Sequence, residues 1–128
     1  MEAVALAEDI GQPRGTYIYF TVDCDVTEAQ LTSKIVPYFQ GVLSILENSD
    51  YLLGVYGPER VCQYICGDFT TSKRCAWYVD NSWLAANGTY DTWNMRQYRF
   101  NKWIGSEQGE ICVDYDESSR YGGGGWQY

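Results

Sequence analysis

The sequence predicts a single α/β domain in which parallel strands, covered by helices, form a barrel-like sheet. Segments with the apolar spacing of helices alternate with short aromatic and β-branched runs, a pattern that favours parallel strands with helices outside. The opening run, residues 17–25, is polar and aromatic on one face and apolar on the other. Acidic residues recur where the predicted strands end, at the edge where a barrel carries its chemistry.

The composition narrows the classes of function. The 128 residues include nine basic and seventeen acidic ones, and the net charge of −8 argues against nucleic acid or an anionic membrane surface as a partner. A neutral or cationic ligand fits this charge better. The chain contains no run of about eighteen apolar residues, the length that would predict a membrane-spanning helix. Histidine is absent, which excludes Ser-His-Asp and Cys-His catalysis and the common His-containing zinc sites.

The five cysteines leave two alternatives open. Cys62 and Cys66 lie four residues apart on a predicted helix, and either can bridge to Cys75 if the chain matures in an oxidising compartment. A four-cysteine metal site that includes Cys24 or Cys112 is the alternative, although its spacing is irregular. We predict no metal and no cofactor, and the odd count leaves at least one thiol free or paired between chains.

The N-terminal half begins with a helix and a strand. Residues 1–10 predict a short helix closed by Gly11, and this acidic segment lacks the basic region of a signal peptide. The strand that follows places alternate side chains on one face: Tyr17, Tyr19, Thr21, Asp23 and Asp25. Two like charges about 6.5 Å apart on one strand are unfavourable, which favours a functional role for the two aspartates. A solvated strand end before a helix cap is the structural alternative.

A long helix is predicted after this strand. Thr27 and Gln30 have the spacing of a capping box, which marks the start of the helix. The apolar positions from Leu31 to Leu46 recur at helical spacing, and this face is expected to pack on a core. Pro37 interrupts the hydrogen bonds of the helix and predicts a kink.

The rest of the chain predicts one further helix and four strands. Pro58 suits the first position of a helix that ends near Cys66. The Asn87-Gly88-Thr89 segment predicts a turn, and the four glycines of residues 122–125 predict a flexible linker with an aromatic end. The predicted strands are residues 51–56, 75–80, 94–100 and 110–116.

Carboxylates follow or end several of these strands. They are Asp23, Asp25, Asp80, Asp114 and Asp116. In a barrel, the carboxyl ends of the strands meet at one mouth, so these side chains are expected to gather there. For Asp114 and Asp116, a surface turn is the favoured alternative.

Four segments resemble a known family: Gly-Gln-Pro at 11–13, Ile-Tyr-Phe-Thr-Val-Asp-Cys-Asp at 18–25, Tyr-Phe-Gln-Gly at 38–41 and Gly-Val-Tyr-Gly at 54–57. The family is the glycoside-hydrolase-like TIM-barrel domain of unknown function 1906, found in bacterial secreted and phage proteins and in some fungi. Its more distant relatives are the family 25 glycoside hydrolases, lysozymes that cleave the sugar backbone of peptidoglycan. The resemblance covers roughly residues 1–116 and implies a polysaccharide or peptidoglycan partner and a secreted or cell-surface location.

The resemblance also implies roles for individual residues. Asp23 and Asp25 match the carboxylate pair of the lysozyme strand, with Asp25 where the lysozymes carry the acid Glu, and Val113-Asp114 matches their last strand. Asp25 is thereby the candidate acid, Asp23 the stabilising carboxylate and Asp114 a nearby third group. The implied sugar-binding residues are Tyr19, Tyr56, Trp77, Gln97 and Tyr98. Core packing is the alternative for Trp77 and Tyr98.

The length limits how much of a barrel is present. A TIM barrel takes about 250 residues, so the resemblance implies a partial (β/α) TIM barrel with about its last five strands and the intervening helices. We place this partial barrel at residues 1–120 and a Gly-rich aromatic tail at 121–128. The missing strands predict an exposed sheet edge that a homo-oligomer or a partner chain completes.

Three functions remain open from the sequence. The first is a cell-wall glycosidase. The second is a carbohydrate-binding module without turnover, which the Glu-to-Asp difference and the missing strands favour. The third is a structural or self-assembling subunit that associates through its sheet edges.

Overall fold

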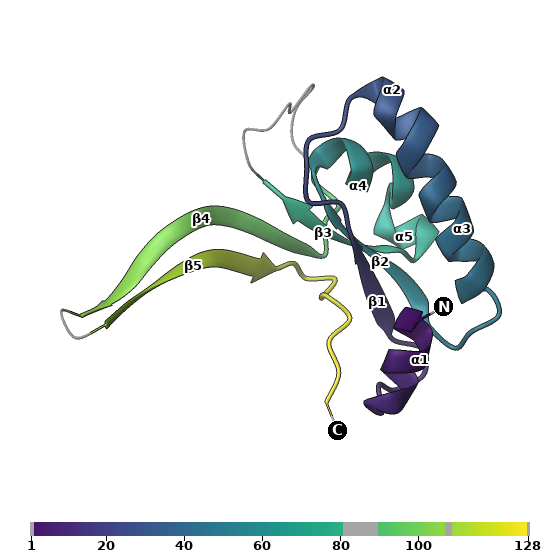
Figure 1. The fold of residues 1–128 in the computed structure, drawn as a ribbon, viewed down its shortest axis with the longest axis horizontal. Helices are drawn as coiled ribbons and strands as arrows, with labels where there is room; N and C mark the ends of the chain where they lie inside the picture. Colours follow the sequence, from purple (N-terminus) through teal and green to yellow (C-terminus); the bar gives the residue numbers. More distant parts are fainter. Residues whose placement is uncertain (1, 81–89, 107–108, 128) are drawn as a thin grey trace.

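The structure is a computed structural model that describes residues 2–80, 90–106 and 109–127. Its centre is a curled, five-stranded mixed sheet in the order β1-β2-β3-β4-β5, a half-barrel of the α/β class with helices packed on one side (Figure 1). The strands are β1 (Tyr17–Thr21), β2 (Leu52–Gly57), β3 (Cys75–Val79), β4 (Met95–Ser106) and β5 (Gly109–Ser118). The helices are α1 (Glu2–Asp9), α2 (Glu28–Gln30), η1 (Leu31–Ile35), α3 (Val36–Leu46), α4 (Glu59–Ile65) and α5 (Phe69–Ser72). The turn predicted at 87–89 lies outside the described residues.

The hydrophobic core lies between the helix-covered face of the sheet and helices α3 and α4. Val55 of β2 is completely buried, and Phe39 of α3 and Val61 of α4 belong to the same cluster. On β1, Ile18 and Phe20 pack partly against this core. The alternation predicted for this strand is therefore confirmed over its apolar half, and the tyrosines of β1 face the concave side.

The first turn of the long helix is capped as predicted. The Gln30 N–H donates to Thr27 Oγ1 at 3.2 Å, and the Thr27 N–H donates to Gln30 Oε1 at 3.0 Å. The predicted kink takes the form of the π-helical segment η1, which precedes Pro37 instead of centring on it. Proline has no N–H, and its ring crowds the carbonyl of Ser33 four residues earlier, so a wider turn at this point relieves the contact.

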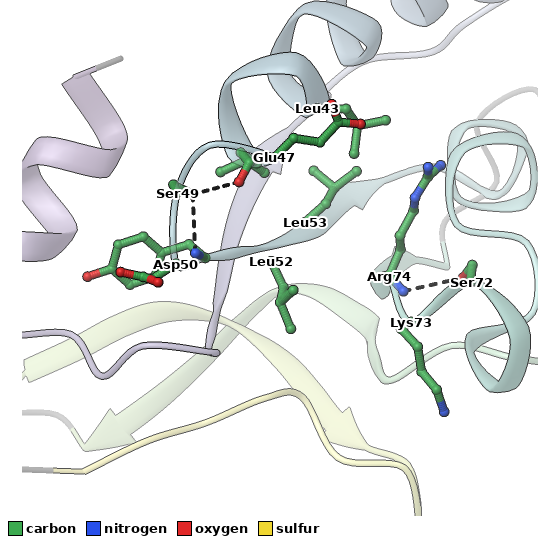
Figure 2. A pocket seen from close by; sticks show the side chains of 11 residues that line it. Leu43, Glu47, Ser49, Asp50, Leu52, Leu53, Ser72, Lys73 and Arg74 are labelled. Carbon is green, nitrogen blue, oxygen red and sulfur yellow. Dashed lines mark hydrogen bonds between the residues drawn. The ribbon is translucent and has the colours of Figure 1, made fainter.

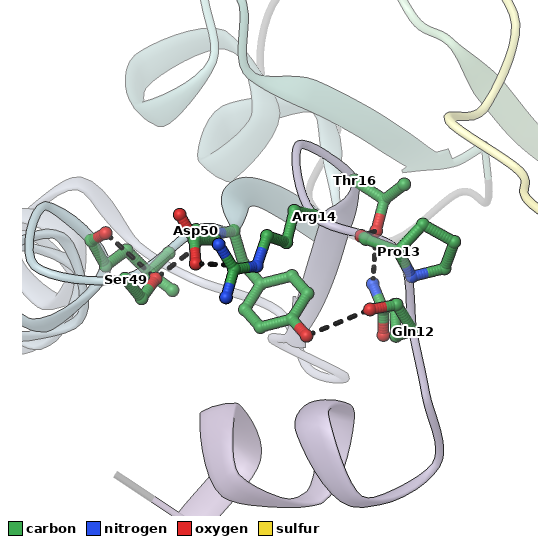
Figure 3. Close-up of polar contacts among 8 residues, drawn as sticks. Gln12, Pro13, Arg14, Thr16, Ser49 and Asp50 are labelled. Atoms are coloured by element: carbon green, nitrogen blue, oxygen red, sulfur yellow. Dashed lines mark hydrogen bonds and ion pairs between the residues drawn. The ribbon is translucent and has the colours of Figure 1, made fainter.

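Side-chain hydrogen bonds hold the turn between α1 and β1 (Figure 3). Gly11 has φ of 74°, which suits glycine at the end of a helix. The Gln12 amide donates to Thr16 Oγ1 at 2.9 Å and to the carbonyl of Tyr17 at 3.0 Å. The Tyr51 hydroxyl donates to the Gln12 carbonyl at 3.0 Å. These contacts tie the starts of β1 and β2 to α1.

The sheet is not entirely parallel as predicted, because its last strand runs in the opposite direction. Strands β1 to β4 pair in parallel, but β5 pairs with β4 in the antiparallel direction. Because β4 ends at Ser106 and β5 begins at Gly109, the connection is too short for the crossover of about a dozen residues that parallel strands need. The outer part of this hairpin is exposed and projects beyond the body of the protein (Figure 1).

The glycine segment, predicted to be a linker, packs on the sheet. The Tyr19 hydroxyl donates to the Gly123 carbonyl at 2.8 Å. A Cβ atom on Gly124 would collide with the ring of Tyr17, and one on Gly123 would collide with Met95. The segment therefore lies against both β4 and β1 on the concave side, and Gly124, with its positive φ and its contact with the Tyr17 ring, is the position that most requires glycine.

All five cysteines are described, and each is a free thiol. Cys24 and Cys112 are exposed, whereas Cys62, Cys66 and Cys75 are buried, so neither of the bridges predicted for Cys75 is present in this structure. Within the described ranges, no three metal-ligating side chains lie close enough together to hold an ion. No helix in this part of the chain is both long and apolar enough to span a membrane.

Candidate functional site

Side chains from four neighbouring strands form one aromatic patch on the concave face. Tyr19 comes from β1, Tyr56 from β2 and Trp77 from β3, and the register pairs Tyr56 with Trp77 directly. The Trp77 ring meets Tyr19 edge to face at 5.9 Å and Tyr56 at 5.1 Å between centroids. Edge-to-face pairs of this kind contribute roughly 0.5–1.5 kcal/mol each beyond the area they bury. With Gln97 of β4, four of the predicted sugar-binding residues lie together.

Hydrogen bonds join this patch to a carboxylate of β5. The Tyr56 hydroxyl donates to Gln97 Oε1 at 2.6 Å, and Gln97 Nε2 donates to Asp114 Oδ2 at 3.3 Å. The main-chain N–H of Asn101 donates to Asp114 Oδ1 at 2.9 Å. Gln97 is only 8% exposed, so its amide is oriented by the Tyr56 hydroxyl and the Asp114 carboxylate, away from bulk water. The amide links a neutral phenol to a carboxylate.

Asp116 belongs to the same patch; the sequence predicts it among the carboxylates at the strand ends but not among the catalytic or sugar-binding residues. Trp77 Nε1 donates to Asp116 Oδ1 at 2.7 Å. The surface turn favoured for Asp114 and Asp116 is wrong, because both lie within β5 and Asp116 pairs with Gln97 of β4. The Asp-Tyr-Asp alternation of residues 114–116 is the sequence signal that indicates a strand with both carboxylates on one face.

Burial and the charges of three carboxylates act on the pKa of the Tyr56 phenol. Burial, with smaller effects of the charges of Asp23, Asp116 and Asp114, raises the pKa of Tyr56 to about 12. Asp23 lies in the loop after β1, and Asp114 and Asp116 lie on β5. The phenol therefore stays protonated at neutral pH and keeps its role as a hydrogen-bond donor to Gln97.

The predicted carboxylate pair lies beyond the end of β1. The strand ends at Thr21, and the N–H of buried Val22 still donates to the Tyr56 carbonyl at 2.8 Å. The face alternation predicted for residues 17–25 consequently stops before the aspartates, which lie in the loop that leads to α2. Asp23 and Asp25 are both exposed in this loop, and the charge of Asp23 acts on the pKa of Tyr56.

Tyr98 lies on the opposite face of β4 from Gln97. Its ring stacks on Tyr115 with centroids 6.3 Å apart and an interplanar angle of 26°. The guanidinium groups of Arg96 and Arg99 lie 5.4 Å and 5.9 Å from the Tyr98 ring centre. Because adjacent side chains on a strand alternate, Tyr98 is not brought to the concave patch.

Asp80 is held in an ion pair on that same outer face. Arg96 Nη1 lies 2.9 Å from Asp80 Oδ2, and Arg96 Nε donates to Glu117 Oε1 at 2.7 Å. The Tyr78 hydroxyl donates to Asp80 Oδ1 at 3.2 Å, and burial, with a smaller effect of the Asp80 charge, raises the pKa of Tyr78 to about 12. Asp80 thus fastens the end of β3 to the hairpin.

A separate cavity of about 380 Å³ lies where β2 begins (Figure 2). Its walls come from the end of α3, the start of β2 and the turn before β3, including Leu43, Leu53 and Arg74. The Arg74 guanidinium donates to the Ile65 carbonyl at 2.9 Å. None of the predicted site residues lines this cavity, and it lies at the opposite ends of the strands from the carboxylates.

Comparisons with known proteins identify similar sequences. The family model described as Rv2525c-like, glycoside hydrolase-like domain matches residues 1–122. The uncharacterized protein YbfG of Bacillus subtilis (strain 168) is 33% identical over 130 residues, which cover 89% of this chain and 17% of YbfG. The uncharacterized protein FadG of the same organism is 35% identical over 66 residues, 49% of this chain and 12% of FadG. The chain spans less than a fifth of these curated relatives, and no solved structure matches it.

Proposed function

Because this chain belongs to the family of Rv2525c-like, glycoside hydrolase-like domains, we propose that its concave patch binds a polysaccharide such as peptidoglycan and hydrolyses it with paired carboxylates. The observation that carries this proposal is the position of Asp114 and Asp116 beside Tyr56 and Trp77, to which they are joined through Gln97 and the Trp77 indole. Paired carboxylates next to aromatic rings are the groups that glycoside hydrolysis needs.

Binding would use the rings and the carboxylates together. The C–H faces of a sugar pack on aromatic rings such as Trp77 and Tyr56, and sugar hydroxyls donate hydrogen bonds to carboxylate oxygens such as those of Asp116. A neutral sugar chain also suits a protein with a net charge of −8, which would repel an anionic ligand.

Hydrolysis requires two different carboxyl groups. One gives its proton to the glycosidic oxygen as the bond to the anomeric carbon breaks, and an ionised one stabilises that carbon or takes a proton from the attacking water. Asp114 and Asp116 accept hydrogen bonds from N–H groups, which orients them as base or stabilising carboxylates. Asp25 is then the proposed acid, and Asp23 is the stabilising group nearest to it in the chain.

A second candidate function, carbohydrate binding without turnover, is favoured by the place of Asp25. This side chain is exposed in the loop after β1, and it is one methylene shorter than the Glu of the lysozymes that the sequence resembles. Proton delivery from this position needs an unusually close substrate, whereas binding through Tyr56, Trp77 and Asp116 does not involve Asp25.

Turnover and binding of purified peptidoglycan separate the two functions. A glycosidase releases reducing ends, and Asp23→Asn and Asp25→Asn then lower this release by at least about tenfold, as the loss of an acid or base group does. Asp9→Asn, an exposed change in α1, is the matched control and should leave release unchanged. Equal release by the native chain and both site variants rules out hydrolysis by this pair. Binding alone is supported if the native chain sediments with peptidoglycan but releases no reducing ends, and if Trp77→Ala no longer sediments with it.

We further propose that the half-barrel is the last part of a TIM barrel distantly related to the family 25 glycoside hydrolases, and that the protein is secreted or located at the cell surface. Four parallel strands with helices on their outer side support the barrel relationship. Within the described residues, no strand pairs with the outer edge of β1, so we propose that a second copy or a partner chain completes the sheet there. A stable monomeric mass in solution contradicts completion by a second copy.

A further inference from the structure

The tail and the concave face line a second cavity, an open one of about 580 Å³. This volume lies within the range of about 300–1,000 Å³ that is usual for small-molecule sites. Tyr17 and Tyr19 of β1 form one wall, Met95 of β4 and Ser118 of β5 form another, and the glycine segment with Trp126 forms the third.

The lining of this cavity selects a neutral ligand. None of its lining residues carries a charged side chain, and its polar groups are the hydroxyls of tyrosine and serine and the peptide groups of the glycine segment. A phosphate, carboxylate or ammonium group would lose its hydration here without gaining an opposite charge. A ring with apolar faces and hydroxyl groups at its edge would instead use both the aromatic wall and the peptide groups.

The cavity lies next to the carboxylate patch. The ring of Tyr19 lines the cavity and also contacts the edge of Trp77, whose indole N–H holds Asp116. One aromatic side chain therefore borders both spaces. We propose that the cavity is a second sugar-ring site in the same polysaccharide groove, an inference that rests on the proposed function. A bound glycan would run from Asp116 and Trp77 past Tyr19 to Tyr17.

The wall formed by the tail depends on individual glycines. Gly124 has φ of 71°, and a Cβ atom there would collide with the Tyr17 ring, so Gly124→Ala must displace the tail or the ring. Gly125 also lines the cavity, but a Cβ atom on it would meet nothing within 4 Å, and its φ lies outside the positive range. The same chemical change at two adjacent residues thus distorts the cavity in one variant and leaves it intact in the other.

The experiment measures binding of β-1,4-linked N-acetylglucosamine oligomers of two and four rings by calorimetry. We expect the native chain to bind the four-ring oligomer at least about tenfold more tightly than the two-ring one, a difference of about 1.4 kcal/mol. Gly124→Ala should abolish this difference while two-ring binding persists, and Gly125→Ala should keep it. Near-UV circular dichroism shows whether each variant retains its fold.

The outcomes separate this inference from the proposed function. Two-ring binding that requires Trp77, without a preference for four rings, overturns the second sugar-ring site and leaves the proposed function standing. A preference for four rings that survives in folded Gly124→Ala also overturns the site. Absence of binding for both oligomers, together with no binding or hydrolysis of peptidoglycan, overturns both proposals.

Discussion

The hydrogen bond between Tyr56 and Gln97 can be tested by a double-mutant cycle. Its donor and acceptor are 2.6 Å apart, and Gln97 is 8% exposed. Tyr56→Phe leaves the Gln97 carbonyl oxygen buried without this donor, a change that costs about 1–3 kcal/mol of unfolding free energy. Gln97→Met, of similar length, removes the acceptor and also the donor to Asp114. We expect the double variant to be less destabilised than the sum of the two single variants by about 1 kcal/mol, because both remove the same bond.

Urea unfolding followed by far-ultraviolet circular dichroism measures these free energies. Tyr64→Phe is the matched control, since Tyr64 is 63% exposed and loss of its hydroxyl should change stability by less than about 0.5 kcal/mol. The reasoning is refuted if Tyr56→Phe is as mild as Tyr64→Phe. It is also refuted if the two single effects add to within about 0.3 kcal/mol, because independent sites behave in that way.

Three further predictions concern thiols, pH and the outer face. Ellman's reagent should titrate two of the five thiols in the native protein and five in urea, and early reaction of a third thiol contradicts the burial described here. Burial raises the pKa of Cys66 from 9.0 to about 12. The stability contributed by the buried neutral thiol is therefore fully present below pH 9, where the unfolded thiol is also protonated. It is lost as the pH rises from 9 to about 12, because only the unfolded thiol ionises in this range. Between pH 8 and pH 10.5, the free energy of urea unfolding should fall by about 2 kcal/mol because of this group, at about 1.4 kcal/mol per pH unit above pH 9. This fall should be absent in Cys66→Ala, and the same pH dependence in both proteins would contradict it. Arg96→Met should lower the free energy of unfolding by about 1 kcal/mol in 0.05 M salt, because the arginine side chain is 31% exposed and solvent partly screens its pairs with Asp80 and Glu117. If the loss is the same in 0.5 M salt, the ion pairs are not its cause.

Local signals in the sequence were sufficient for most elements of the first eighty residues. The Thr27 and Gln30 side chains cap the helix that follows, and that cap is a short-range hydrogen-bond pattern. Strand β2 begins one residue after the predicted start, and β3 begins at Cys75 as predicted. Apolar runs bounded by turns determine such elements because burial of their own side chains decides their conformation.

The direction of β5 and the place of the tail could not be read from local patterns. The predicted segments 94–100 and 110–116 leave nine residues between them, and only extension of both strands into a hairpin makes the connection short. The packing of Gly123 and Gly124 against β4 and β1 depends on side chains distant in the chain. Composition alone indicates flexibility in a glycine run, whereas the structure uses the run for close approach of backbone to rings.

The candidate site was predicted best where residues share a strand face and least well where the backbone is irregular. Tyr56, Trp77 and Gln97 meet because side chains on paired strands align. The sequence pattern predicts that side chains alternate between the two faces as far as Asp25, but β1 ends at Thr21 and the alternation ends there. Loop positions have no period, so they cannot be assigned to a face from sequence.

The antiparallel return of β5 explains how a half-barrel brings carboxylates to the mouth of its parallel strands. Asp116 pairs with Gln97, which pairs in turn with Val79 at the end of β3. Irregular pairing between Gln97 and Lys102 adds residues to β4, and Asn101 adopts φ of 53° within this irregular stretch. A β-bulge leaves an N–H outside the ladder, and here the Asn101 N–H donates to Asp114. Asparagine tolerates positive φ better than most residues, so one local irregularity both bends the hairpin and orients a carboxylate of the site.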